Sequence, residues 1–178
     1  MEENREQSGW QVISSLAGRM HLRIPEEYRK PSDEVAAVKF PVTPRPQEIY
    51  INPEGNRILT FNLLDKPLQE QQVYPAVLEM QRVISHAYPE SIRVQAKELK
   101  TDAGMIGWFA FVTGGIREDS MHCMFILPLD DNMMLGSYHF PAEQMEEERR
   151  IFMQMLKSIQ LEVKSSSGKQ GVGNETGI

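Results

Sequence analysis

Short stretches of alternating polar and apolar residues indicate strands in several parts of the chain. Residues 19–24 and 92–97 place an apolar side chain at every second position, and this period of two is typical of a strand with one buried face. Residues 48–52 and 57–64 flank the segment Asn-Pro-Glu-Gly-Asn at positions 52–56. Because proline and glycine favour turn conformations there, these two stretches predict a β-hairpin.

Three later stretches, residues 105–113, 121–127 and 133–140, are apolar at most positions of both parities. Such strands are covered on both faces, or are covered on one face and line a pocket with the other. Gly114-Gly115 and the segment at residues 128–132 supply the two reversals. The pattern therefore predicts an antiparallel meander, and the two glycines are turn residues rather than a phosphate-binding loop, since they join two strands.

Helical spacing appears in the segment 68–88. One face of this predicted helix carries Val73, Val77, Met80, Ile84 and Ala87, the spacing of an amphipathic helix. Pro75 must lie in the first turn of the helix or kink it. A short helix is expected at residues 33–38, and residues 25–28 fit a single helical turn that begins at a proline.

The last predicted helix begins near Pro141. Its apolar stripe comprises Met145, Phe152, Leu156 and Ile159, and its solvated side comprises Glu146, Glu147, Glu148, Arg149 and Arg150. The stripe cannot also bury Ile151, Met153 and Met155 unless it is wide, and this surplus indicates an exposed patch or an oligomer interface. Methionines are dense across this part of the chain, where they fill an irregular core or form an adaptable binding surface.

Composition places the chain among ordinary globular proteins, with 178 residues, 40% hydrophobic and 25% charged. We expect a frayed N-terminus at residues 1–8, a single domain at 9–160 and a disordered Ser/Gly-rich tail at 161–178. The net charge of -6 argues against a nucleic-acid partner, whose binding needs clustered Lys and Arg. No apolar run fits a signal peptide or a membrane span, so we expect a cytoplasmic protein without membrane insertion.

Candidate catalytic groups are few. Cys123, the one cysteine, lies mid-strand among apolar residues, which favours a buried thiol over a nucleophile. The neighbouring His122 points to the opposite face, where it and His139 could approach each other across the meander. Asp130 and Asp131 fall in a predicted turn, where Asp side chains bond to the local backbone. We expect no catalytic, cofactor-binding or metal-ligating residue, no cofactor and no enzymatic activity.

Several short phrases together resemble a known superfamily. They are Leu22-Arg23-Ile24-Pro25 followed by Tyr28, Phe125-Ile126-Leu127-Pro128 followed by Asp130-Asp131, and the closing Met155-Leu156-Lys157-Ser158-Ile159. With the hairpin and the long helix, they are similar to PsbP-like domains, and above all to the bacterial branch. That branch includes domains of unknown function and the adaptor chaperones of type VI secretion effectors. The photosystem II extrinsic proteins and the Ran-release factors are more distant relatives, and we expect neither of their roles here.

The resemblance implies an α/β/α sandwich (α+β) with a central, largely antiparallel sheet of six or seven strands flanked by helices, spanning residues 19–159. It also implies binding or adaptor work. The leading hypothesis is a non-catalytic, chaperone-like adaptor that holds an apolar segment of another protein. Two alternatives stay open: a pocket for a small apolar ligand between sheet and helix, and an enzyme acting through His122 and His139 or through Asp130 and Asp131. The sequence leaves the partner-binding residues, the partner and any homo-oligomer unassigned.

Overall fold

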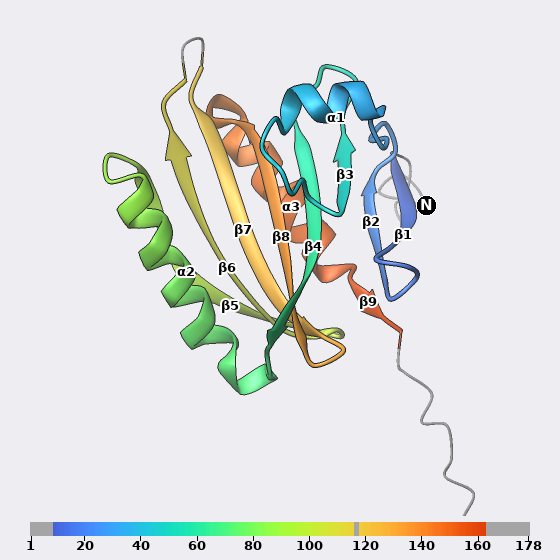
Figure 1. Ribbon diagram of the computed structural model, residues 1–178, viewed down its shortest axis with the longest axis vertical. Coiled ribbons are helices and arrows are strands. Elements are labelled where there is room, and N and C mark those ends of the chain that lie inside the picture. The colour runs from blue at the N-terminus through green and yellow to red at the C-terminus, as the bar shows by residue number, and fades with distance from the viewer. Residues whose placement is uncertain (1–8, 116–117, 163–178) are drawn as a thin grey trace, which may run out of the picture.

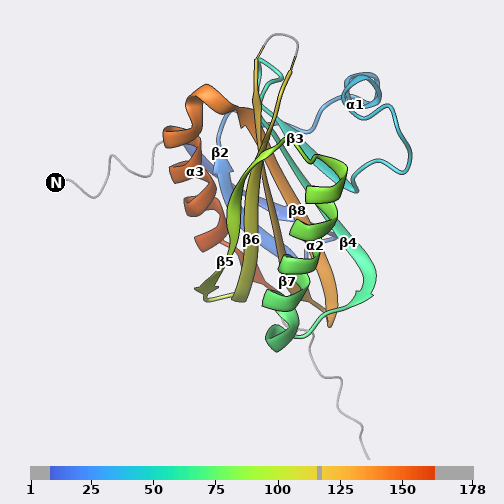
Figure 2. The same ribbon diagram turned by 90° about the vertical axis from the view of Figure 1, so that its left-hand side faces the viewer.

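A six-stranded sheet forms the middle layer of the protein, with helices on both faces (Figures 1 and 2). The computed structural model describes residues 9–115 and 118–162. The strands are β3 (Glu48–Ile51), β4 (Ile58–Pro67), β5 (Ile92–Thr101), β6 (Gly104–Thr113), β7 (Ser120–Leu129) and β8 (Asn132–Pro141). Their order is β3-β4-β8-β7-β6-β5 and every neighbouring pair is antiparallel. The predicted α/β/α sandwich and its antiparallel meander are confirmed.

Helices α1 (Asp33–Lys39) and α2 (Val73–Ala87) lie on one face of this sheet, and α3 (Met145–Lys157) lies on the other (Figure 2). Two short 3₁₀ turns, η1 (Glu70–Gln72) and η2 (Ala142–Gln144), lead into α2 and α3. Pro75 lies in the first turn of α2, as predicted, where its missing N–H leaves no hydrogen bond unmade.

A second sheet of three strands was not predicted. It pairs β1 (Trp10–Ser15), β2 (Met20–Pro25) and β9 (Gln160–Leu161), and it lies beside α3 (Figure 2). The expected strand at 19–24 is present as β2, and it belongs to this small sheet and not to the central one. β9 extends ordered structure to Leu161, one residue past the expected end of the domain. Residues 1–8 and residues 163–178 of the predicted tail lie outside the described residues.

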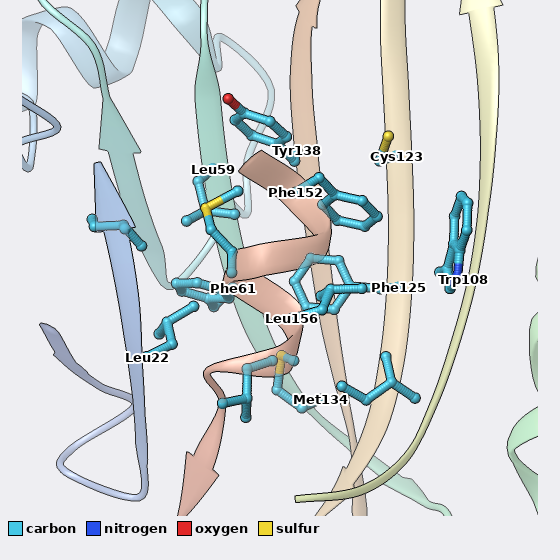
Figure 3. Packing of buried hydrophobic residues seen from close by; sticks show 14 of the residues in the cluster. Leu22, Leu59, Phe61, Trp108, Cys123, Phe125, Met134, Tyr138, Phe152 and Leu156 are labelled. Carbon is cyan, nitrogen blue, oxygen red and sulfur yellow. The ribbon is translucent and has the colours of Figure 1, made fainter. Parts of the chain in front are cut away.

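The larger core lies between the central sheet and α3 (Figure 3). Phe152 and Leu156 of α3 are each 1% exposed. Phe152 packs edge-on against Trp108 and Phe125, with ring centroids 5.7 Å apart in both cases. Because such aromatic pairs add to the free energy of burial, α3 is fixed firmly to this face.

A smaller core lies between the sheet and α2. Val73 and Val77 of α2 are fully buried, and a Cβ atom built on Gly107 of β6 would lie 2.9 Å from Val73 and 3.1 Å from Val77. Helix and sheet therefore touch where only a glycine fits. Both faces of the meander carry buried side chains, as its two-sided apolar pattern predicted.

Three local predictions were wrong. Residues 25–28 close a single turn, with the Tyr28 N–H donating to the Pro25 carbonyl at 3.1 Å, but Pro25 does not begin a helix because it is the last residue of β2 and pairs with Trp10. Met145 is 44% exposed and does not belong to the buried stripe of α3.

Glu148, expected on the solvated side of α3, is 1% exposed. The carboxylate is held in the interior by two donors, Arg57 and Tyr138. Among the predicted surplus residues, Met155 is buried while Ile151 and Met153 are partly buried, so most of that surplus belongs to the core.

Candidate functional site

The central sheet is left partly open on the face that carries α1 and α2. The register places the residues of β7, β8 and β4 on this face in rows that run across the strands. We call the half-buried members of these rows the sheet strip: His122 and Met124 of β7, Leu135, Ser137 and His139 of β8, and Asn62 and Leu64 of β4. Figure 1 shows β7, β8 and β4 passing between α2 and α1 with no helix across them.

The strip lies between the areas that the two helices cover. Helix α2 packs on β5, β6 and β7, and its Met80 and Ile84 border the strip on that side as partly buried residues. Helix α1 covers the other end of the face, where Ala36 and Phe40 pack against the isoleucines of β3 and β4. The two helices together do not cover the full width of the sheet, so part of the surface of β8 and β4 stays uncovered on this face.

A pair of histidines forms one end of the strip. His122 and His139 are directly opposite each other on β7 and β8, with ring centroids 5.0 Å apart. The hydroxyl of Thr113 lies 2.8 Å from Nε2 of His122. Burial and the neighbouring His139 lower the pKa of His122 to about 4. Burial, and then Lys39, also lower the pKa of His139, so both rings are neutral at pH 7.

The other polar side chains of the strip are uncharged: Ser137 lies between Met124 and Thr60 in the register, and Asn62 lies opposite Leu135. The hydroxyl groups of Ser137 and the buried Thr60 are 2.7 Å apart and bond to each other. Asn62 accepts a hydrogen bond from the backbone N–H of Gln47 at 3.0 Å. The remaining members, Leu135, Met124 and Leu64, are apolar, so the whole strip carries no ionised side chain at neutral pH.

The residues considered for catalysis are not assembled into a reactive site. Cys123 is buried on the opposite face from His122, in the larger core, and burial raises the pKa of its thiol to about 12, so a thiolate is not available. Asp130 and Asp131 have positive φ angles of 52° and 63° at the centre of the β7–β8 turn, as expected for a two-residue hairpin turn.

The carboxylate of Asp130 pairs with Arg19 at 3.0 Å, while that of Asp131 accepts a hydrogen bond from Gln69 at 3.3 Å. Both aspartates therefore stabilise the fold around the turn. Within the described ranges 9–115 and 118–162, no group of three or more His, Cys, Asp or Glu residues could hold a metal ion. His122 and His139 do approach each other, as the sequence indicated, but no third ligand from this part of the chain joins them.

Sequence reasoning missed a buried polar network on the α3 side. Tyr28 and Tyr138, 1% and 0% exposed, join their hydroxyl groups at 2.7 Å. Tyr138 donates to Glu148, and Arg57 donates to Glu148 and, at 2.5 Å, to the side-chain oxygen of Gln144. Burial raises the pKa of both tyrosines. The network connects the start of α3 to β8 and to the β3–β4 turn, so its role is to stabilise the fold.

Comparisons with known proteins identify the fold. No protein-family model matches the chain, and no curated protein matches its sequence. The solution structure of cyanobacterial PsbP (CyanoP) from Synechocystis sp. PCC 6803 is similar with a TM-score of 0.60 at 8% identity, covering 86% of this chain and 93% of that chain. A mutant of the protein Mog1 gives a TM-score of 0.51 at 11% identity, covering 85% and 95%.

The structure of LpqN, involved in cell envelope biogenesis of Mycobacterium tuberculosis, gives a TM-score of 0.54 at 7% identity, covering 88% of this chain and 93% of that chain. At such identities the likeness shows the fold and not the role. The chain has the PsbP-like fold, and the predicted resemblance is confirmed at that level. No helix within the described residues is long and apolar enough to cross a membrane.

Proposed function

We propose that this protein is a non-catalytic binding or adaptor protein of the PsbP-like fold, and that its sheet strip holds an apolar segment of a partner protein. The observation that carries the proposal is the strip itself, a half-buried band without ionised side chains between the parts of this face that α1 and α2 cover. Exposed bands of this kind on a rigid framework mark interaction sites. Methionine side chains within the strip (Met124) and at its border (Met80) adapt to varied apolar partners.

The chemistry around the strip also supports binding over catalysis. The hydroxyl groups of Ser137 and Thr60 bond to each other, and His122 contacts the hydroxyl of Thr113 and the ring of Phe111. A histidine that activates a hydroxyl nucleophile is itself oriented by a third group, as a rule a carboxylate, and the ring that lies beside His122 on β8 is the neutral His139. The fold neighbours PsbP, Mog1 and LpqN, none of them named for a reaction, agree with a binding role.

The alternative of a small apolar ligand between sheet and helix has less support. Helix α2 touches β6 at Gly107, and on the α3 face the ring of Phe125 covers Gly136 so closely that a Cβ there would lie 2.1 Å from it. A hollow of about 420 Å³ between α2 and β5 is lined by two arginines, two glutamines, a serine and a leucine, which does not suit an apolar ligand.

Site-specific photo-crosslinking tests the proposal. A photoreactive phenylalanine analogue replaces Leu135 in the strip, and the same analogue replaces Gln154, an exposed residue of α3, as the matched control. In the native host we expect Leu135 to capture a discrete partner whose crosslinked peptide, identified by mass spectrometry, is apolar. Gln154 should not capture it.

If both positions capture the partner equally, or if the crosslinked peptide is rich in charged residues, the proposal is wrong. A thermal-shift screen with apolar metabolites addresses the alternative on the unmodified protein. A rise of several degrees with one small molecule would favour the ligand pocket over the partner segment.

A further inference from the structure

Of the two edges of the central sheet, the one formed by β5 is open. The opposite edge strand, β3, is paired with Arg29, whose backbone exchanges two hydrogen bonds with Ile51 at 3.0 and 2.9 Å. In the part of the chain that the structure describes, β5 pairs with β6 alone, and no backbone group of residues 95–101 bonds to the backbone of another segment. Figure 2 views the molecule from this side, with α2 and α3 to either side of β5. The outward N–H and C=O groups of β5 are therefore open to pairing with a further strand.

A β-bulge divides β5 into two parts. The register with β6 shifts between Val94 and Lys97, and the side-chain amide of Gln81 in α2 donates to the carbonyl oxygen of Val94 at 3.0 Å. From Lys97 to Thr101 the pairing with β6 is regular again. Because a bulge interrupts a ladder locally, the stretch after it is the part of the edge that an added strand can follow.

The α3 side of this edge is mainly apolar. Val94 and Leu99 are half-buried against the larger core, and Ile92 is 76% exposed. Lys97 lies between them with its ammonium group 5.8 Å from the ring centroid of Trp108, and its methylene stem adds to the apolar surface. Apolar side chains of an added strand would therefore be partly covered on this side.

The α2 side of the edge is polar and cationic. Arg93 and Gln95 line, with residues of α2, the hollow of about 420 Å³ described above. Lys100 points to this side as well, because it follows Leu99 in the strand. Neither Arg93 nor Lys100 forms an ion pair within the described ranges 9–115 and 118–162, so both cations are available to a partner.

We propose that the open edge of β5 binds an extended segment of a partner protein in which acidic and apolar residues alternate. Since successive side chains of a strand point to opposite faces, such a segment places its apolar side chains beside Val94 and Leu99. Its carboxylates then lie on the side of Arg93 and Lys100, while its backbone continues the sheet. This edge is apart from the sheet strip on β7, β8 and β4, so the inference adds a second interaction surface and does not depend on the proposed function.

Charge complementarity favours an acidic segment over a second copy of this chain. β5 carries the cations Arg93, Lys97 and Lys100 against the single carboxylate of Glu98, although the chain as a whole has a net charge of -6. Two β5 strands side by side would double the local excess of positive charge, and lysines on an edge strand oppose such self-pairing. A segment that carries carboxylates neutralises the excess.

A phage library of random heptapeptides, selected on the immobilised full chain, tests this inference. We expect selected peptides with acidic and apolar residues at alternate positions. With one synthetic peptide bound, hydrogen–deuterium exchange should slow at the backbone amides of residues 97–101 and stay unchanged on β7, β8 and β4. A library without a binder, binders without acidic residues, or protection that falls on the strip strands instead of β5 overturns the inference.

N-methylation of the peptide backbone separates strand pairing from simple charge attraction. Each N-methyl group removes one donor, so it should weaken binding about tenfold at every second position and little at the positions between, whose N–H groups point away from β5. A uniform effect along the peptide contradicts pairing with the edge.

Variants of the protein locate the charges. Arg93→Gln/Lys100→Gln should weaken peptide binding about tenfold, because two ion pairs with the segment are lost. Arg45→Gln/Lys66→Gln, which removes the same charges from exposed positions elsewhere, is the matched control and should leave binding unchanged. Equal losses in the two variants, or no loss in the first, overturn the inference.

Discussion

Replacing Arg57 with methionine should be among the most destabilising single changes available at a partly accessible position of this fold. Arg57 donates to the carboxylate of Glu148 and to the side chain of Gln144. The side chain of Glu148 is 2% exposed, and that of Arg57 is 21% exposed. With methionine at position 57, the carboxylate keeps a single donor, the hydroxyl of Tyr138.

The size of the effect follows from the charge left behind. Breaking a buried ion pair by removing one partner costs about 3–5 kcal/mol, because the other charge stays desolvated without compensation. A Coulomb energy at about 4 Å and an effective dielectric constant of about 20 gives a similar value of about 4 kcal/mol. With a urea m-value of about 2 kcal/mol/M, the unfolding midpoint should fall by about 2 M.

Urea unfolding followed by circular dichroism measures this midpoint at pH 7. Arg82→Met is the matched control, since Arg82 pairs with Glu79 at the fully exposed surface of α2, where we expect no measurable shift. The double variant Arg57→Met/Glu148→Leu removes both charges and should recover most of the lost stability. A midpoint for Arg57→Met that matches the Arg82→Met control would refute the assignment of Glu148 as a buried, compensated charge.

Further predictions concern pH, the thiol and a glycine. The folded state holds the pKa of His122 at about 4 against 6.5 for the free side chain, so the unfolded chain takes up the proton first. The free energy of unfolding should therefore fall as the pH drops from 6.5 to 4, by at most about 3 kcal/mol. A His122→Gln variant whose urea midpoint falls with pH as much as that of the unmodified protein would contradict this. Cys123 should be inert to a thiol reagent at pH 8 until urea unfolds the chain, and rapid labelling of the native protein would show that it is not buried. Gly136→Ala should cost about 1–3 kcal/mol because the new methyl group meets the Phe125 ring, and Phe125→Leu in the same chain should recover part of the loss; a thermal midpoint unchanged by Gly136→Ala would contradict the close approach.

The fold was largely readable from the chain because its signals are local. The two-sided apolar strands between residues 105 and 140, the helical spacing from Val73 to Ala87 and the turn residues between strands each depend on neighbours in sequence. β1 escaped prediction for a physical reason. Of its residues only Ile13 and Ser15 are buried, and Ser15 is buried as the hydrogen-bond donor to Glu48, a contact between distant segments that no local pattern records.

The candidate site was less predictable because it depends on which parts of a face the helices leave open. His122 and His139 were recognisable as neighbours from strand register alone. Their place at the edge of an uncovered band follows from the position of α2, which is fixed by contact at Gly107. Glu148 sits in a run of charged residues that resembles any solvated helix face, and its burial depends on Arg57, which is distant in the chain.

The side chains of β8 alternate between the buried polar network on one face of the sheet and the sheet strip on the other. Tyr138 points to the α3 face, where its hydroxyl group joins Tyr28 and Glu148 in the buried network. Ser137 and His139, on either side of it, point to the opposite face and belong to the sheet strip. Because successive side chains of a strand alternate between faces, the bonds that anchor β8 to α3 also hold the strip in place. A strand fixed on one face offers a partner a preorganised surface on the other, and less ordering entropy is then lost when the partner binds.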